Sequence, residues 1–190
     1  MESGRKAGHA TVVDKADGSG SYVVVFLDRS DNHYPVAQVR HILIKAVADS
    51  DGSYTDKAKE IAKSRAEEIL AEFNAGDKTE DSFAELAKDY SEDTGSAENG
   101  GLYDTVYKGA TVEEFDKFCF EGHKKGDTAI VYGESSSYAG YHVMYYVGEG
   151  DLYSNLLAKN DLVNTTVSQW VEDQVNALTV TNGWWLRIAG

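Results

Sequence analysis

Two histidines lie in apolar runs that are typical of β-strands. His41 lies in Val-Arg-His-Ile-Leu-Ile-Lys, and His142 lies in Tyr-His-Val-Met-Tyr-Tyr-Val. Because side chains alternate along a strand, His41 shares a face with Val39 and Leu43, and His142 shares one with Met144. A single histidine in such a run is most often a satisfied structural residue. If the two strands are neighbours, however, the buried rings can satisfy each other by a hydrogen bond with fixed tautomers.

Two other kinds of chemistry are weaker candidates. Cys119 is the only cysteine, which excludes a disulfide within the chain, and its neighbours Phe118 and Phe120 supply no base. A buried structural thiol is therefore favoured over a nucleophile. A metal site built from His41, Asp93 and His142 is an alternative, but the sequence has neither a helical HExxH motif nor Cys/His ligand spacing.

Alternating strands and helices must position these side chains. Periodicity predicts one long helix over residues 56–75, closed by Gly76, and a second that begins near Ser82, where Ser82 and Glu85 have the form of a capping box. Residues 91–110 are rich in Gly, Ser, Asn and Asp and are expected to form a loop. The remaining expected elements are strands at 21–27, 39–45, 128–132 and 141–147, a short helix at 112–119, and an amphipathic helix over 163–178. This last helix is expected to pack on the body of the protein, with a client-binding or dimerising arm as the alternative.

Composition limits the classes of partner. The 190 residues include 42% hydrophobic residues, enough for a real core, and carry a net charge of −14. Nucleic acids and anionic membranes attract clustered Lys and Arg, so both are disfavoured as partners. No apolar run approaches the roughly 20 residues of a membrane span, and no signal peptide is visible. We expect the chain to be part of a longer protein.

Four segments, in order, resemble the parvulin family of peptidyl-prolyl cis/trans isomerases. They are the strand around His41, the helix and loop over 83–101, the segment 115–127 and the strand around His142. The resemblance covers residues 36–148 and is closest to the secreted foldases of bacteria. It implies an α+β fold: a four-stranded, mainly antiparallel sheet with packed helices, here followed by a C-terminal helical extension. It also implies isomerisation of X-Pro bonds without a cofactor.

The family's site residues can be carried over by position. The resemblance assigns the catalytic positions to His41, Asp93 and His142, with Asp93 near the substrate carbonyl and neighbouring Glu92 as the alternative. It assigns the substrate-binding positions to Leu102, Tyr103, Thr111, Phe115 and Phe120.

Two features depart from the family. Thr111 stands where bacterial parvulins usually have Met in the proline pocket, and Leu102-Tyr103-Asp104-Thr105 replaces the usual acidic-Leu-Gly-aromatic run. Both changes alter the pocket wall. The runner-up function is accordingly a parvulin-like chaperone or client-binding module with little or no isomerase activity. The loop over 46–53 is acidic where phospho-specific parvulins have Arg and Lys, so phosphate recognition is not expected.

A repeat suggests a further domain boundary. Residues 121–131 with the strand at 141–147 resemble residues 2–13 with the strand at 22–27. We therefore expect residues 1–35 to be the C-terminal remnant of an upstream parvulin-like repeat plus a linker, residues 36–148 the parvulin domain, and residues 149–190 a helical extension. By resemblance, the partners are unfolded or nascent polypeptides with X-Pro bonds, and the location is extracytoplasmic in a bacterium. Any membrane or lipid anchor of the parent protein would lie outside this chain.

Overall fold

The computed structural model describes residues 6–28 and 32–178. The chain divides into two compact units, Met1–His33 and Tyr34–Gly190. The outer parts of the expected N-terminal and C-terminal segments, residues 1–5 and 179–190, lie outside the described residues.

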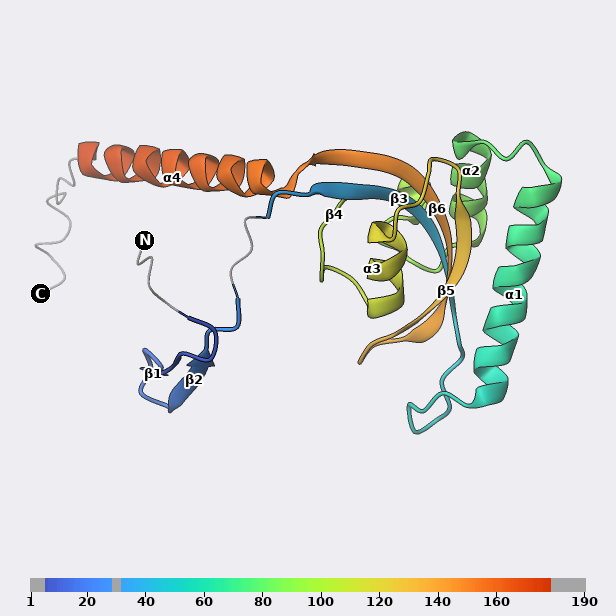
Figure 1. The fold of residues 1–190 in the computed structure, drawn as a ribbon, viewed down its shortest axis with the longest axis horizontal. Helices are drawn as coiled ribbons and strands as arrows, with labels where there is room; N and C mark the ends of the chain where they lie inside the picture. The colour runs from blue at the N-terminus through green and yellow to red at the C-terminus, as the bar shows by residue number, and fades with distance from the viewer. Residues whose placement is uncertain (1–5, 29–31, 179–190) are drawn as a thin grey trace, which may run out of the picture. The chain divides into compact units, whose positions relative to one another are not determined.

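The larger unit is built on a four-stranded sheet in the order β4-β3-β6-β5 (Figure 1). Every neighbouring pair in this sheet is antiparallel. The expectation of an α+β fold on an antiparallel four-stranded sheet is confirmed. The strands are β3 (Pro35–Lys45), β4 (Leu102–Val106), β5 (Thr128–Glu134) and β6 (Ala139–Leu152).

Strand β4 was expected to be loop. Its sequence, Leu-Tyr-Asp-Thr-Val, follows two glycines, and only Val106 is buried. It is an edge strand, held by backbone pairing with β3 rather than by an apolar face of its own. Hydrophobic alternation therefore could not reveal it.

Three helices cover the two faces of the sheet (Figure 1). Their bounds are α1 (Asp56–Ala75), α2 (Glu80–Tyr90) and α3 (Glu113–Phe120). Helix α1 has the expected limits, because the Thr55 side chain caps its first turn and Gly76 ends it. The capping box of α2 is formed by Thr79 and Ser82, so the expected start at Ser82 lies inside the helix.

Each face of the sheet has its own core. On one face, α1 and α2 pack Ile69, Phe73 and Phe83 against Ile42 and Val143. On the other, α3 packs its aromatic side chains against the alternate residues of β3 and β6. This second group comprises Val39, Val106, Phe115, Phe118, Met144 and Tyr146. The histidine pair described below lies on this second face, beside Phe115.

Helix α4 (Tyr153–Ala177) begins upstream of the expected position and contains no buried residue. At its start, the ring of Tyr153 stacks on Tyr107 and contacts Tyr34. The expectation that this helix packs along the body of the protein is therefore wrong for its described residues. No helix in the described part of the chain is both long and apolar enough to cross a membrane.

The smaller unit contains a two-stranded antiparallel sheet. Strands β1 (Ala10–Asp14) and β2 (Ser21–Val25) pair along their full length, and all ten of their residues are exposed. An isolated hairpin of this kind is marginally stable at best in water.

Candidate active site

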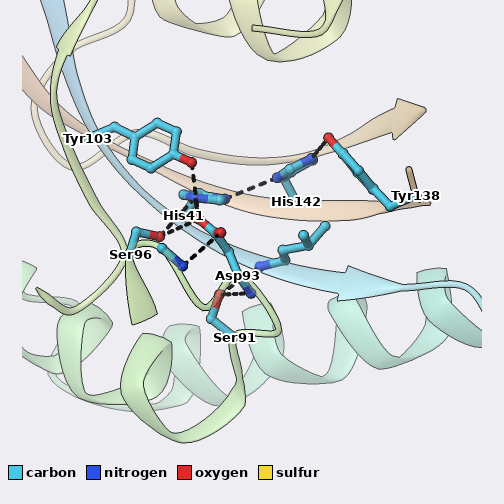
Figure 2. A network of polar contacts seen from close by, with 9 residues as sticks. His41, Ser91, Asp93, Ser96, Tyr103, Tyr138 and His142 are labelled. Atoms are coloured by element: carbon cyan, nitrogen blue, oxygen red, sulfur yellow. Dashed lines mark hydrogen bonds and ion pairs between the residues drawn. The ribbon is translucent and has the colours of Figure 1, made fainter. Parts of the chain in front are cut away.

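The two histidines meet at the centre of the sheet. His41 on β3 and His142 on β6 lie on paired strands, and their Nδ1 atoms are 3.0 Å apart. Both side chains are nearly inaccessible, at 2% and 4% exposure. The expected contact is present (Figure 2).

Asp93 completes a polar network on the other side of His41. Its Oδ2 atom lies 3.0 Å from His41 Nε2 and accepts hydrogen bonds from Ser96 Oγ at 2.6 Å and Tyr103 Oη at 3.1 Å (Figure 2). The bond with His41, together with Ser96, holds the pKa of the Asp93 carboxyl well below its usual range. Glu92 instead accepts a hydrogen bond from the Lys45 backbone, so the structure brings Asp93, not Glu92, to the histidines.

Two adjacent glycines allow the loop that carries Asp93 to lie against β3. Gly100 and Gly101 have φ of 64° and 70°, which L side chains rarely adopt. A Cβ atom on Gly101 would lie 2.1 Å from the carbonyl oxygen of His41, and the Gly101 carbonyl accepts a hydrogen bond from His41 N at 2.9 Å. The Gly-Gly pair therefore fixes the backbone of the first histidine.

The second histidine is held by Tyr138 and kept neutral. Tyr138 Oη lies 3.0 Å from His142 Nε2. Gly133 leaves room for the ring, because a Cβ there would lie 2.7 Å from His142 Nε2. Burial, with a smaller contribution from His41, lowers the pKa of His142 to about 3.

These bonds define a directed chain of donors. The ionised Asp93 requires a proton on His41 Nε2. The neutral His142 then donates from Nδ1 to His41 Nδ1, and its Nε2 accepts from the Tyr138 hydroxyl. Each of these three hydrogen bonds then has one donor and one acceptor. Tyr138 and Ser96, which the sequence interpretation missed, are thus part of the network.

A pocket of about 350 Å³ opens above the histidine pair. It is lined by His41, Tyr103, Ala110, Thr111, Val112, Phe115, Tyr138 and His142. Burial and the adjacent Asp93 raise the pKa of Tyr103 to about 12, so this wall is an uncharged phenol. The pocket has apolar walls and a few convergent polar groups, which is typical of a binding site for a small ring.

Phe115 is a core residue as well as a pocket wall. Its side chain is 2% exposed and meets the rings of His41 and His142 edge-on at 5.4 and 5.3 Å. Phe115 therefore lines the pocket with a ring that is itself buried. Thr111 lines the same pocket, and its buried hydroxyl has no hydrogen-bond partner among the described residues.

Two expected substrate-binding residues lie elsewhere. Phe120 is five residues after Phe115, which is roughly 140° around a helix. It contacts Tyr34 and Lys108 and lines a separate cavity of about 190 Å³. Leu102 pairs with Arg40 and points to the opposite face of β4 from Tyr103, because neighbours on a strand alternate. Neither residue lines the pocket above the histidines.

The alternative chemistries have little geometric support. Burial raises the pKa of the Cys119 thiol to about 12, which fits an inert core residue. Within residues 6–28 and 32–178, no group of three His, Cys, Asp or Glu side chains is arranged to hold a metal ion. All four ring nitrogens of His41 and His142 are already engaged in the network.

Comparison with known proteins decides the family. Residues 23–147 match the family model of the PPIC-type PPIase domain. The chain belongs to this parvulin family of peptidyl-prolyl isomerases. Among its curated relatives, foldase protein PrsA 3 of Bacillus anthracis is 29% identical over 159 residues, covering 80% of this chain and 48% of the relative. Foldase protein PrsA of Staphylococcus aureus strain Newman is 36% identical over 139 residues, covering 73% of this chain and 40% of the relative.

Solved parvulin structures give a looser match. The crystal structure of the peptidylprolyl isomerase PrsA from Bacillus anthracis is 24% identical with a TM-score of 0.46, and the match covers 80% of this chain and 64% of that one. The chain spans about half or less of the length of the two curated relatives above.

Proposed function

We propose that this domain isomerises X-Pro bonds in unfolded or nascent polypeptides and serves as a protein-folding factor. The observation that carries the proposal is the apolar pocket directly above the bonded pair of His41 and His142. Family membership supports the same reaction. No cofactor is needed for it, since isomerisation forms and breaks no covalent bond.

The geometry suits a reaction that consists of rotation alone. Rotation about the X-Pro bond must overcome a barrier of about 18–20 kcal/mol, because amide resonance is lost. The planar amide is more polar than the twisted one, so transfer into an apolar pocket favours the twisted form. The pocket must bind the twisted amide better than the planar one, and each 1.36 kcal/mol of that preference gives about tenfold in rate.

The polar network supports the pocket from below. Asp93 anchors His41 and Tyr103, and Tyr138 anchors His142, so four pocket-facing rings have fixed orientations. Preorganised side chains of this kind avoid reorganisation during the reaction. We assign His41, Asp93 and His142 a role in shaping the site, without proton transfer to the substrate.

Neighbouring carboxylates offer a matched test. In an assay of X-Pro isomerisation on a short peptide, Asp93→Asn should lower kcat/KM by about tenfold or more, because the anchor of His41 and Tyr103 loses its charge. Glu92→Gln, which changes the adjacent residue outside the pocket, should leave kcat/KM nearly unchanged. Equal effects in the two variants would contradict the assignment.

A parvulin-like chaperone remains the second candidate. Thr111 lines the pocket and has a buried hydroxyl without a hydrogen-bond partner among the described residues. Helix α4 exposes Val167, Trp170 and Val171, which could bind unfolded clients. Binding of a permanently unfolded protein without acceleration of X-Pro exchange would favour this function. Extracytoplasmic action is a further part of the proposal, based on the resemblance to secreted bacterial foldases, and cell fractionation would test it.

A further inference from the structure

The exposed hairpin β1-β2 repeats the backbone of the hairpin β5-β6. Gly8 N donates to Phe26 O, and Gly126 N donates to Tyr146 O, both at 2.9 Å. In return, Phe26 N donates to His9 O at 2.9 Å, just as Tyr146 N donates to Asp127 O at 2.9 Å. Both glycines have left-handed φ, 84° for Gly8 and 93° for Gly126.

The turn before each hairpin and the strand register agree as well. His9 N donates to Lys6 O, and Asp127 N donates to Lys124 O, at 3.0 and 2.9 Å. The first ladder pairs are then Ala10 with Val25 and Thr128 with Tyr145. One alignment therefore satisfies three hydrogen bonds, a glycine conformation and the strand pairing.

Side chains at matched positions are of the same kind. Val12 and Val13 correspond to Ile130 and Val131 on the first strand. On the second strand, Val23, Val24, Val25 and Phe26 correspond to Val143, Met144, Tyr145 and Tyr146. The hairpin β1-β2 thus has apolar side chains on both faces, as does β5-β6, which belongs to a sheet with both faces covered.

The surroundings of the two hairpins differ. Val143 is fully buried, because β6 pairs with β3 along its other edge and helices cover both faces of the sheet. The matched Val23 is 73% exposed, and β1-β2 forms a sheet of only two strands among the described residues. The surroundings of β5-β6 therefore indicate which neighbours β1-β2 would need: a strand along its other edge and helices over both faces of the sheet.

We propose that residues 6–27 are the closing hairpin of a second parvulin-like unit, and that the free edge of β2 pairs with a β3-type strand of that unit. A second copy of this chain is a poor occupant, since its β3 already has β4 on one edge and β6 on the other. The partner is thus a parvulin-like sheet that lacks its own last hairpin.

The alignment also predicts what the second unit does. Tyr22 pairs with Val13 as His142 pairs with Val131, so Tyr22 stands at the position of the second histidine. A unit closed by this hairpin has no imidazole pair. It would therefore lack the isomerase site described above.

A hairpin graft tests the proposal. In the full chain, residues 6–27 would replace residues 124–147, so that β1-β2 must close the sheet on β3. In the matched control, Leu27 is also deleted from the graft, which moves residues 21–26 by one position along β3 and turns their side chains to the opposite faces. Thermal unfolding and amide hydrogen exchange would be measured for both.

The graft should unfold cooperatively, at least about 10 °C above the control, and protect the amides of β3 and of the grafted strand. A graft that is no more stable than its slipped control would overturn the proposal. So would a stable graft without protection on the grafted strand. Neither readout uses isomerase activity, so failure here and failure of the proposed function are distinguishable.

Discussion

At the scale of single residues, the site contains one ionised carboxylate, Asp93, and one neutral imidazole, His142. Asp93 keeps its charge because three side-chain hydrogen bonds converge on one of its oxygens. His142 stays neutral because burial penalises its cation. Folding therefore shifts the pKa of both groups downward, but the two shifts act in different pH ranges.

The neutral state of His142 should be visible in the pH dependence of the free energy of unfolding. The pKa of His142 falls from 6.5 to about 3 on folding, so its contribution to stability is complete above pH 6.5 and is lost as pH falls toward 3. Within that window, the free energy of unfolding should drop by about 1.4 kcal/mol per pH unit on account of this residue. Urea unfolding of the native chain and of His142→Asn between pH 6 and pH 4.5 would measure the difference. Equal slopes for the two proteins would contradict the buried, neutral state.

Thr111 should limit activity. Its unpaired buried hydroxyl costs about 1–3 kcal/mol, and Met would offer the proline ring more apolar surface. Thr111→Met should therefore raise kcat/KM several-fold, toward the tenfold that 1.36 kcal/mol allows. Thr111→Val, which removes the hydroxyl without adding length, separates the two effects. Unchanged or reduced activity in a well-folded Met variant would show that the residue does not face the substrate ring.

Phe115 should behave as a core residue. Its ring is buried against both histidines, so Phe115→Ala is expected to lower the free energy of unfolding by about 3–5 kcal/mol. Phe120→Ala should cost less, because the Phe120 ring beside Tyr34 is only partly buried. Denaturant unfolding of the pair would measure both. A Phe115 variant of native stability would indicate an open pocket at this position.

At the scale of elements, the sequence predicted the helices and strands that have a regular hydrophobic pattern. The apolar stripe of α1 and the position of Gly76 predicted its limits, and alternation along β3 and β6 placed the two histidines on one face. Strand β4 was not predicted, because backbone pairing with β3 holds it in the sheet rather than an apolar face of its own. Family position alone put Phe120 and Leu102 in the pocket, whereas helix and strand periodicity turn them away from it.

Tyr138 and Ser96 show a second limit of predicting the site from the sequence. Both bond the network through contacts that form only after folding, and neither stands in a run that marks a site. The nearest signal was spacing, since Ser96 follows Asp93 by three residues. Such a spacing is too common in loops to select one serine.

Helix α4 should be dispensable for the stability of the parvulin domain. None of its side chains is buried, and Tyr153 at its start makes the ring contacts with Tyr34 and Tyr107. A chain truncated after Leu156 keeps those contacts and should change its Tm by no more than a few degrees, within about 1 kcal/mol. Differential scanning calorimetry would test this, with Tyr153→Ala in the full chain as the comparison. A drop of more than about 10 °C on truncation would mean that α4 packs on the domain.

At the scale of the whole molecule, the chain joins a parvulin domain to exposed apolar elements. The hairpin β1-β2 and helix α4 both present large apolar side chains to solvent, among them Val23 and Trp170. The sequence pattern predicted a similarity between the two hairpins, and the hydrogen-bond register shows how closely their backbones agree.

The proposed isomerase activity can be measured at equilibrium. The central measurement is NMR exchange spectroscopy on a short peptide with one X-Pro bond, mixed with a small molar fraction of the full chain. Without a catalyst, exchange takes tens of seconds or longer. The wild-type chain should accelerate it by at least about tenfold, and the peptide should shift the signals of Thr111 and His142 rather than those of Phe120. Exchange at the uncatalysed rate, with the peptide demonstrably bound, would contradict an isomerase and leave a binding module in its place.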